Sequence, residues 1–421
     1  MASSTGRPGR EEGEGQASEE VLQGLAREGG GLRVHLPGGA GYSVGWHVLS
    51  IIRLWPAYIR MLARIWEEVC RIWAVDTHEH IYPYHMIAGR KPTIFEVLEG
   101  SYVSWIVEMP EKGDYRALAE RLRRVRGSAF LRSCIEAVRD LHGVDISDLS
   151  EESLRLASQR ISEAYSDKGW QREVLRRRAR IIRCVLDPYW DPWIEDYDRE
   201  LFVPALRINM FLFGYNRRAR DHNGNSPYDL AEKLGFQIES FDDYLEFIDH
   251  VLELAKERGY VCLKSALAYD RHLYFGEVGE EEARMVFGRD EVSEAEKRKF
   301  GDFIMHYILS RAEELSLPVQ FHTGLARISG SSPMNLVNLF EKYPGVKFIL
   351  FHGGYPWTSE VAALALTYPN VYADLCWLPI ISPSAATRLL RELIETTGGC
   401  KVMWAETLSC TFYILLCLLR Q

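Results

Sequence analysis

The segment Val75–His80 carries the residues of this chain that are best suited to chemistry. A short apolar run, Trp73–Val75, leads through Asp76 to two histidines, His78 and His80, that lie two positions apart. Side chains alternate between the two faces of a strand, so both imidazoles are expected to point the same way. Imidazole nitrogens are common ligands of divalent metals. The segment therefore predicts part of a metal site at the end of a strand.

Two more histidines stand at the ends of later apolar runs. His322 follows Val319–Phe321, and His352 follows Val346–Phe351 and precedes two glycines, which allow backbone or ligand to approach closely. We expect His322 to be a third metal ligand, with a buried structural histidine as the alternative. We expect His352 to be a ligand or, because imidazole titrates near neutral pH, a general acid or base.

Four further polar residues are candidates for the same site. Lys264 ends an apolar run, and a buried lysine is costly unless it is paired, modified or neutral, so it is either catalytic or ion-paired to a carboxylate. Tyr269 and Arg271 follow in the next loop. Arg271 is predicted to bind a substrate carboxylate through two hydrogen bonds, with a surface salt bridge as the alternative. Asp374, also at a strand end, is predicted to orient a ligand histidine or to contact substrate.

The pattern of the chain from residue 181 onward indicates how these residues are positioned. Strand-like runs alternate with helical stretches, which implies parallel strands joined by crossover helices. The runs are Ile181–Leu186, Phe202–Ile208, Tyr260–Lys264, Val319–Phe321, Val346–Phe351, Val371–Leu375 and Lys401–Trp404. With the strand before His78 the total is about eight, the number that closes a (β/α)₈ TIM barrel. Polar residues at several strand ends favour this α/β barrel over a doubly wound sheet.

The remaining segments set the expected domain organisation. Residues 1–43 are rich in Gly, Glu and Arg and are predicted to be a flexible, disordered leader, followed by one barrel over residues 44–421. Residues 81–180 have a helical pattern and form an expected insertion after the first strand. The apolar segment Trp46–Trp73 carries too many charges for a membrane span and is predicted to be an amphipathic helix. The apolar segment Leu408–Leu419 is too short to span a membrane.

Composition limits the classes of partner. The 421 residues are 47% apolar and 26% charged, which is typical of a globular protein, and the net charge is -9. This balance argues against a nucleic-acid binder, and we interpret the arginines of residues 172–183 as a solvated helix face. Eight cysteines scattered singly, and no signal peptide, favour a reducing, cytoplasmic location. The expected partner is a small-molecule substrate, and a homo-oligomer is compatible with the sequence.

These motifs together resemble the amidohydrolase superfamily, specifically its amidohydrolase-related group. Three of them, Asp76–His80, Phe321–Gly324 and Leu350–Pro356, occur in the order of that family. The segments Leu263–Arg271 and Tyr368–Leu375 are similar to the nodulin-like domain that is fused ahead of type I glutamine synthetase in some plants and fungi. The resemblance extends from about residue 73 to residue 406.

The resemblance implies a metal-dependent hydrolase. One or two divalent ions, usually zinc, are expected on His78, His80 and His322, and Lys264 holds the position of a lysine that is carboxylated in some relatives and then bridges two metals. The implied reaction is attack of metal-activated water on an amide-like C–N bond of a small carboxylate-bearing substrate. The same architecture also serves non-oxidative decarboxylases and uronate isomerases, which the motifs do not separate.

The eighth strand departs from the family pattern. The family has an aspartate there that binds metal and takes a proton from the attacking water, but this chain has Thr407, with Glu406 one residue earlier. Neighbouring strand residues face opposite sides, so Glu406 replaces the aspartate as a catalytic residue only if the strand end bends. A non-catalytic barrel that binds a ligand or a partner subunit is therefore a further alternative.

Overall fold

The computed structural model describes residues 71–82 and 91–404, together with residues 32–35, 41–44, 60–61, 63–65 and 67–69. The chain divides into two units at Arg71 and Ile72. In the first unit, β1 (Leu32–His35) and β2 (Gly41–Val44) form an antiparallel pair, and the described positions between 60 and 69 are helical. The rest of the predicted leader, most of the segment Trp46–Trp73, and the tail from residue 405 lie outside the described residues.

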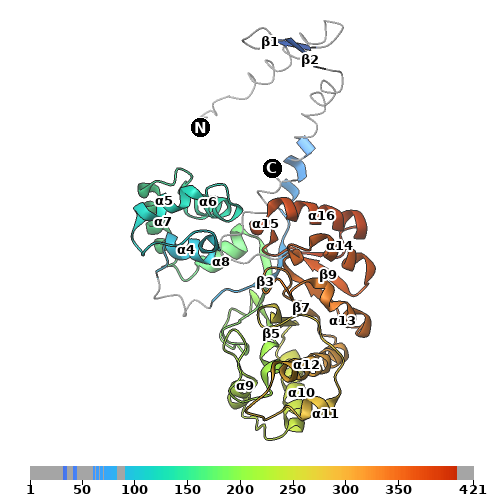
Figure 1. Cartoon of the computed structure of the whole chain (residues 1–421). Helices are drawn as coiled ribbons and strands as arrows, with labels where there is room; N and C mark the ends of the chain where they lie inside the picture. The colour runs from blue at the N-terminus through green and yellow to red at the C-terminus, as the bar shows by residue number, and fades with distance from the viewer. Residues whose placement is uncertain are drawn as a thin grey trace, which may run out of the picture. The chain divides into compact units, whose positions relative to one another are not determined.

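Parallel strands form a nearly closed barrel in the second unit (Figure 1). The described strands follow the order of the sequence around the sheet: β3 (Ala74–Glu79), β4 (Ile181–Leu186), β5 (Phe202–Arg207), β6 (Cys262–Ser265), β7 (Val319–Phe321), β8 (Phe348–Leu350), β9 (Val371–Asp374) and β10 (Val402–Met403). The Thr77 amide donates to the Trp404 carbonyl at 3.3 Å, which links the first strand to the end of the last. The predicted (β/α)₈ barrel is confirmed.

Helices and short turns connect these strands. They are η3 (Asn209–Phe213), α9 (Pro227–Leu234), α10 (Phe241–Glu257), η4 (Leu267–Tyr269), α11 (Glu280–Arg284), α12 (Glu294–Leu315), η5 (Pro333–Leu336), α13 (Val337–Lys342), η6 (Phe351–Gly354), α14 (Thr358–Thr367), α15 (Leu378–Ile381) and α16 (Pro383–Thr397). The longest, α12, begins at a capping box in which Ser293 and Glu296 bind each other's backbone amides. The apolar faces of the barrel helices pack on the strands in one continuous core.

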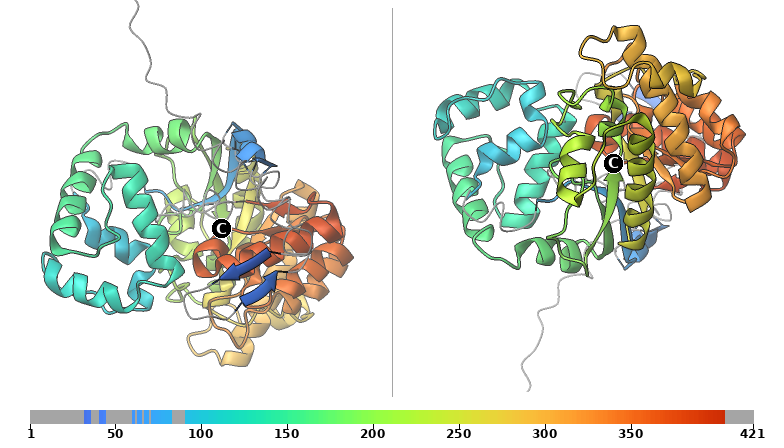
Figure 2. Two further views of the ribbon diagram at one scale, coloured as in Figure 1. Left: turned by 90° about the horizontal axis from the view of Figure 1, so that it is seen from above. Right: turned by 90° about the horizontal axis from the view of Figure 1, so that it is seen from below.

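The segment between β3 and β4 is helical, as expected of an insertion, and gathers to one side of the barrel (Figure 2). Its elements are α4 (Ile94–Gly100), η1 (Val103–Trp105), α5 (Tyr115–Arg124), α6 (Ala129–His142), α7 (Glu151–Ala164), α8 (Trp170–Arg172) and the π-helical turn η2 (Glu173–Arg178). Thr93, Asp114, Ser128 and Ser150 cap the first turns of the four longer helices. These helices bury a small core of their own, separate from the barrel core.

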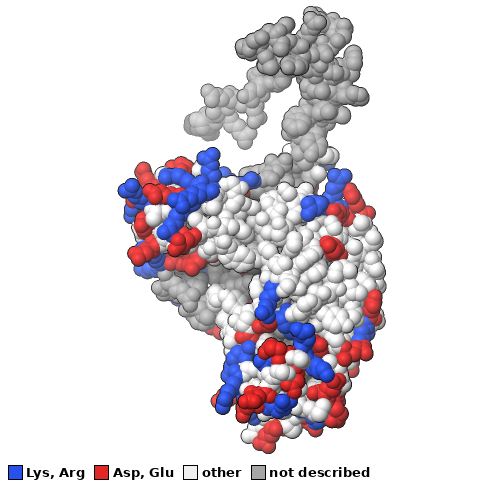
Figure 3. All heavy atoms as spheres, in the orientation of Figure 1, with Lys and Arg blue, Asp and Glu red and all other residues white. Residues whose placement is uncertain are grey.

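Charged side chains of both signs intermix over the insertion on the face shown in Figure 3. Arg172 illustrates the arrangement, since its guanidinium pairs with Asp198 at 2.6 Å and with Glu200 at 2.8 Å while remaining half exposed. The arginine-rich stretch is therefore a solvated face balanced by carboxylates. None of the helices in the described part of the chain has the length and apolar run that crossing a bilayer requires.

Gly324 allows the loops after β7 and β8 to meet at the barrel mouth. Its φ is +88°, and a Cβ atom there would lie 2.3 Å from the Tyr355 carbonyl oxygen. Alanine at Gly113, with φ +98° and open space around it, would meet only the backbone cost of about 1–2 kcal/mol. We expect Gly324→Ala to cost about 1–3 kcal/mol more than Gly113→Ala, because of crowding. Urea unfolding of both variants measures the difference, and equal midpoints would contradict the close approach.

Candidate metal centre and active site

His78, His80 and Asp187 form a compact group at the carboxyl ends of β3 and β4. One potential ligand atom from each residue lies within 4.8 Å of the others. The two imidazole rings are 4.4 Å apart and nearly perpendicular, so the predicted convergence of the histidines is confirmed. Such a set of two imidazoles and one carboxylate could hold a divalent metal ion.

Hydrogen bonds and burial leave suitable donor atoms in this group. His80 Nδ1 donates to the Asp187 carbonyl at 2.8 Å, which leaves Nε2 with its lone pair. The buried Nδ1 of His78 has no hydrogen-bond partner among the described residues. Burial lowers the pKa of His80 to about 4 and holds the pKa of His78 well below its usual value. Both rings are therefore neutral near pH 7, which is the form that binds metal.

Asp187 is fixed by two cationic side chains. Arg207, at the end of β5, donates from Nε to one carboxylate oxygen at 3.0 Å and from a terminal nitrogen to the other at 2.6 Å. Lys264 Nζ lies 3.8 Å from the same carboxylate. Burial alone would raise the pKa of Asp187, but Arg207, His80 and Lys264 hold it below its usual value. Asp187 is therefore an anion with a fixed orientation.

Lys264 lies inside the barrel, where only 1% of its surface is exposed. Its ammonium group sits 3.7 Å from the centre of the Phe351 ring and has no hydrogen-bond partner in the described part of the chain. Burial lowers its pKa to about 7, against the opposing effect of Asp187. A substantial fraction of neutral amine is therefore present near neutral pH, as a reactive lysine requires.

His322 and His352 form a second histidine pair. The outer nitrogens of the pair each contact a backbone carbonyl at 3.0 Å: His352 Nδ1 that of Cys376 and His322 Nε2 that of Leu325. The two remaining nitrogens, His352 Nε2 and His322 Nδ1, face each other at 3.0 Å. Carbonyl oxygens only accept, so three contacts require three protons, whereas two neutral imidazoles supply two. Burial lowers the pKa of His352 to about 3 and that of His322 well below its usual value, so both rings are neutral near pH 7 and their shared contact lacks a proton. The structure brings His322 to His352, and Asp187 is the residue that joins His78 and His80.

The other predicted residues fall in different places. The Tyr269 ring lies 4.5 Å from the His322 ring, close to the pair. Arg271 is bonded to the Asp302 carboxylate and to the backbone carbonyls of residues 272, 274 and 298, so its guanidinium is committed within the chain. Glu406 lies outside the described residues.

Asp374 anchors the strand that carries the two metal-site histidines. Its carboxylate binds the Thr77 hydroxyl and, at 2.6 Å, the Cys376 amide. The Gln320 amide group, from β7 across the barrel, donates to the Thr77 carbonyl at 3.0 Å. Burial raises the pKa of Asp374 to about 6. Through its hydrogen bond to Thr77, Asp374 therefore holds the backbone next to His78 in position.

Asp187 and Arg207 were missed from the sequence although a signal was present. Asp187 directly follows the predicted strand Ile181–Leu186, and Arg207 is the last residue but one of the predicted strand Phe202–Ile208. Applying the strand-end rule to the second and third strands would have found them both.

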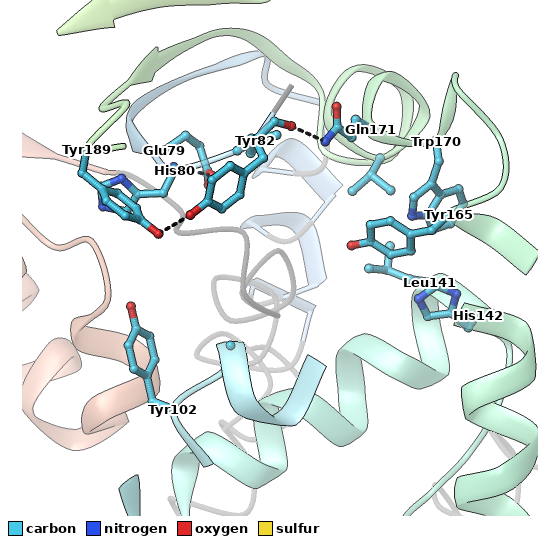
Figure 4. Close-up of a pocket in the computed structure, with 13 residues that line it drawn as sticks. Glu79, His80, Tyr82, Tyr102, Leu141, His142, Tyr165, Trp170, Gln171 and Tyr189 are labelled. Atoms are coloured by element: carbon cyan, nitrogen blue, oxygen red, sulfur yellow. Dashed lines mark hydrogen bonds between the residues drawn. The ribbon is translucent and has the colours of Figure 1, made fainter. Parts of the chain in front are cut away.

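A cavity of about 360 Å³ opens beside His80, between the barrel and the insertion (Figure 4). His142, in the last turn of α6, forms part of its far wall. Burial, and then Arg178, lower the pKa of His142 to about 4. The cavity is thus uncharged at this wall near neutral pH.

His142 gives the stability of the protein a pH dependence. Below pH 6.5 the unfolded imidazole takes a proton that the folded one refuses until about pH 4, so stability is lost as pH falls through this window. Partial exposure reduces the loss to about 1–2 kcal/mol. We expect His142→Gln to lose less stability than the unmodified protein between pH 7 and pH 4.5. Urea unfolding at both pH values measures this, and parallel losses would contradict it.

Part of the chain is similar to known proteins. Residues 234–405 match the family model described as amidohydrolase. The chain is 29% identical over 206 residues to protein fluG of Emericella nidulans. The aligned region covers 44% of this chain and 24% of that protein. The chain thus spans about a quarter of the length of this curated relative.

Solved structures share the barrel. A uronate isomerase from Thermotoga maritima superposes with a TM-score of 0.66 at 17% identity, over 86% of this chain and 89% of its own. A glucuronate isomerase from Caulobacter crescentus gives 0.65 at 16% identity, over 86% of each chain. A candidate metal-dependent hydrolase from Lactobacillus casei gives 0.58 at 18% identity, over 84% and 86%. The family match over residues 234–405 supports an amidohydrolase-related barrel, and the solved structures share its fold.

Proposed function

We propose that this barrel is a metal-dependent hydrolase that cleaves an amide-like C–N bond in a small molecule. The observation that carries the proposal is the group of His78, His80 and Asp187, whose ligand atoms lie within 4.8 Å of one another at the strand ends of an amidohydrolase-related barrel. Several strands contribute polar groups to this end of the barrel, as in other TIM-barrel active sites.

The residues present fit a divalent metal, zinc being the expectation from the sequence. The neutral imidazoles leave His78 Nδ1 and His80 Nε2 as donors, and the anionic carboxylate of Asp187 supplies charge. When bound, such an ion lowers the pKa of a water ligand and polarises a carbonyl group. Arg207 holds the carboxylate of Asp187 in one orientation, which limits its reorganisation on binding.

The chain's own residues would then handle protons and charge. We assign to His352 the acceptance of a proton from the nucleophile and its return to the leaving amine, since its contact with His322 lacks one proton when both rings are neutral. His322 becomes the partner that holds this proton in place. Lys264, whose pKa is about 7, would stabilise developing negative charge as an ammonium group or, as the resemblance implies, act as a carboxylated ligand.

Among the described residues, no free arginine lies at this site to bind the substrate carboxylate that is expected from the sequence. Arg271 is bonded to Asp302 and Arg207 to Asp187. Tyr269, beside His322, is the remaining predicted binding residue. We therefore propose a substrate with an amide-like C–N bond and assign no residue to a substrate carboxylate.

Metal analysis combined with product analysis tests the proposed function. The purified full chain is analysed for bound metals by elemental mass spectrometry and then assayed for ammonia, carbon dioxide and aldose–ketose conversion over panels of primary amides, carboxylic acids and uronates. Stoichiometric metal with ammonia release is expected. Carbon dioxide or isomerised uronate without ammonia would replace hydrolysis by one of the two alternative reactions. Metal without any turnover would favour the non-catalytic barrel.

A further inference from the structure

The cavity beside His80 is walled largely by aromatic rings from two parts of the chain (Figure 4). Tyr82 and Tyr189 come from the loops after β3 and β4, whereas Tyr165 and Trp170 come from the insertion. Its volume of about 360 Å³ falls within the range of small-molecule sites, roughly 300–1,000 Å³. The insertion therefore closes a ligand-sized space over the candidate metal centre.

The rings on the barrel side are held in fixed positions. Tyr82 stacks on Trp190 with ring centres 4.0 Å apart, and the Tyr82 and Tyr189 hydroxyls share a 2.5 Å hydrogen bond. Tyr189 in turn meets the His80 ring edge to face at 5.3 Å. A planar ring entering this space would find aromatic faces and edges already in place, with little side-chain ordering left to occur.

The charges that line the cavity disfavour an ionic ligand. Its described lining contains no lysine or arginine, and the single carboxylate, Glu79, is fully buried. The other polar lining residues are neutral, and the Gln171 amide donates to the Tyr82 carbonyl at 3.0 Å. An uncharged planar group fits this described lining, which offers no cationic side chain to a carboxylate.

Tyr102 adds one hydrogen-bond donor to this apolar space. Its phenol points from the insertion towards His80 and Tyr189 (Figure 4), and its hydroxyl has no hydrogen-bond partner among the residues that the structure describes. Its backbone is left-handed, with φ 66°, which is costly for a residue with a side chain. Trp377, with φ 67°, packs on its ring at 4.8 Å. Backbone strain of this kind is concentrated at functional sites.

We infer that this cavity binds the uncharged aromatic part of the substrate and that the Tyr102 phenol donates a hydrogen bond to the carbonyl oxygen of the bond to be cleaved. The inference rests on the proposed hydrolase, because it places that bond beside His80. The substrate class is an aromatic amide, with its ring among Tyr82, Tyr165 and Trp170 and its amide group towards the metal centre.

A matched pair of probes tests the preference for a ring. Benzamide and cyclohexanecarboxamide carry the same amide on a planar and on a saturated six-membered ring. Calorimetric titration of the zinc-loaded full chain is expected to give about fivefold tighter binding of benzamide. Equal affinities, or no binding of either probe, would overturn the inference.

Two variants test the donor separately from the ring preference. Tyr102→Phe keeps the ring on Trp377 and removes only the hydroxyl, so it should weaken both probes by about fivefold and leave their ratio unchanged. Tyr274→Phe removes a hydroxyl from a tyrosine that is 54% exposed and outside the cavity lining, and should change neither affinity. Unchanged binding by Tyr102→Phe would overturn its assignment as the donor.

Metal uptake keeps this inference apart from the proposed function. The same titrations are repeated on protein treated with a chelator, with zinc measured by elemental mass spectrometry. A ring preference in a protein that takes up no zinc would support the aromatic site and refute the hydrolase. Full zinc uptake with equal affinities for the two probes would refute the aromatic site and leave the hydrolase standing.

Discussion

Replacing His78 and His80 together with alanine is expected to abolish stoichiometric zinc binding and to lower amide turnover by on the order of 10³-fold or more. These residues supply two of the three converging donor groups, and Asp187 alone, already bonded to Arg207, is a poor ligand set. Without an acidified water, the remaining residues have no nucleophile to activate. Elemental mass spectrometry and ammonia release measure the two effects on the same preparation.

The control for this double variant is a histidine outside the site. His250→Ala, on the exposed face of α10, should keep the full metal content and full turnover. Because alanine at two buried positions also opens space in the barrel, thermal unfolding must show that the double variant is folded at the assay temperature. A folded double variant that retains all its zinc would place the metal elsewhere and refute the assignment.

The barrel could be predicted because most of its strands, β5 to β9, are almost wholly buried on both faces. Such strands read as nearly continuous apolar runs, and the runs at residues 181–186 and 319–321 coincide with β4 and β7 to the residue. Polar residues lie near the carboxyl ends of these runs. Arg207 of β5 pairs in register with Lys264 of β6, which pairs with Gln320 of β7. The sequence was therefore informative about which end of the barrel carries the site.

The pairing of side chains within the site could not be predicted in the same way. Strand position brings polar groups to one end of the barrel, but tertiary packing decides which of them meet. Arg271 was expected at the substrate and instead meets Asp302 of α12, a residue 31 positions later in the same connection between β6 and β7. The aromatic cavity likewise depends on how the insertion packs over β3 and β4, and helical periodicity in residues 81–180 carries no information about that.

Removal of the Arg207 guanidinium is expected to destabilise the barrel by about 3 kcal/mol. Arg207→Met leaves Asp187 fully buried without its two-point partner, and breaking a buried ion pair typically costs roughly 3–5 kcal/mol. We expect the lower end of that range, because Lys264 stays 3.8 Å from the carboxylate and compensates part of its charge. Urea unfolding measures the loss, and Arg391→Met, which removes an exposed arginine paired with Glu395, should leave the midpoint unchanged.

A paired variant separates the energy of the buried charge from that of side-chain packing. In Asp187→Leu/Arg207→Met neither charge remains, and replacing a buried pair by apolar residues of similar volume is often neutral or stabilising. Without Asp187 to raise its pKa, Lys264 can remain in the barrel as the neutral amine. The paired variant should thus be more stable than Arg207→Met although it lacks a proposed metal ligand. If both variants unfold at the same urea concentration, lost packing rather than an uncompensated carboxylate explains the defect, and Arg207 is not what holds Asp187 in its ionised form.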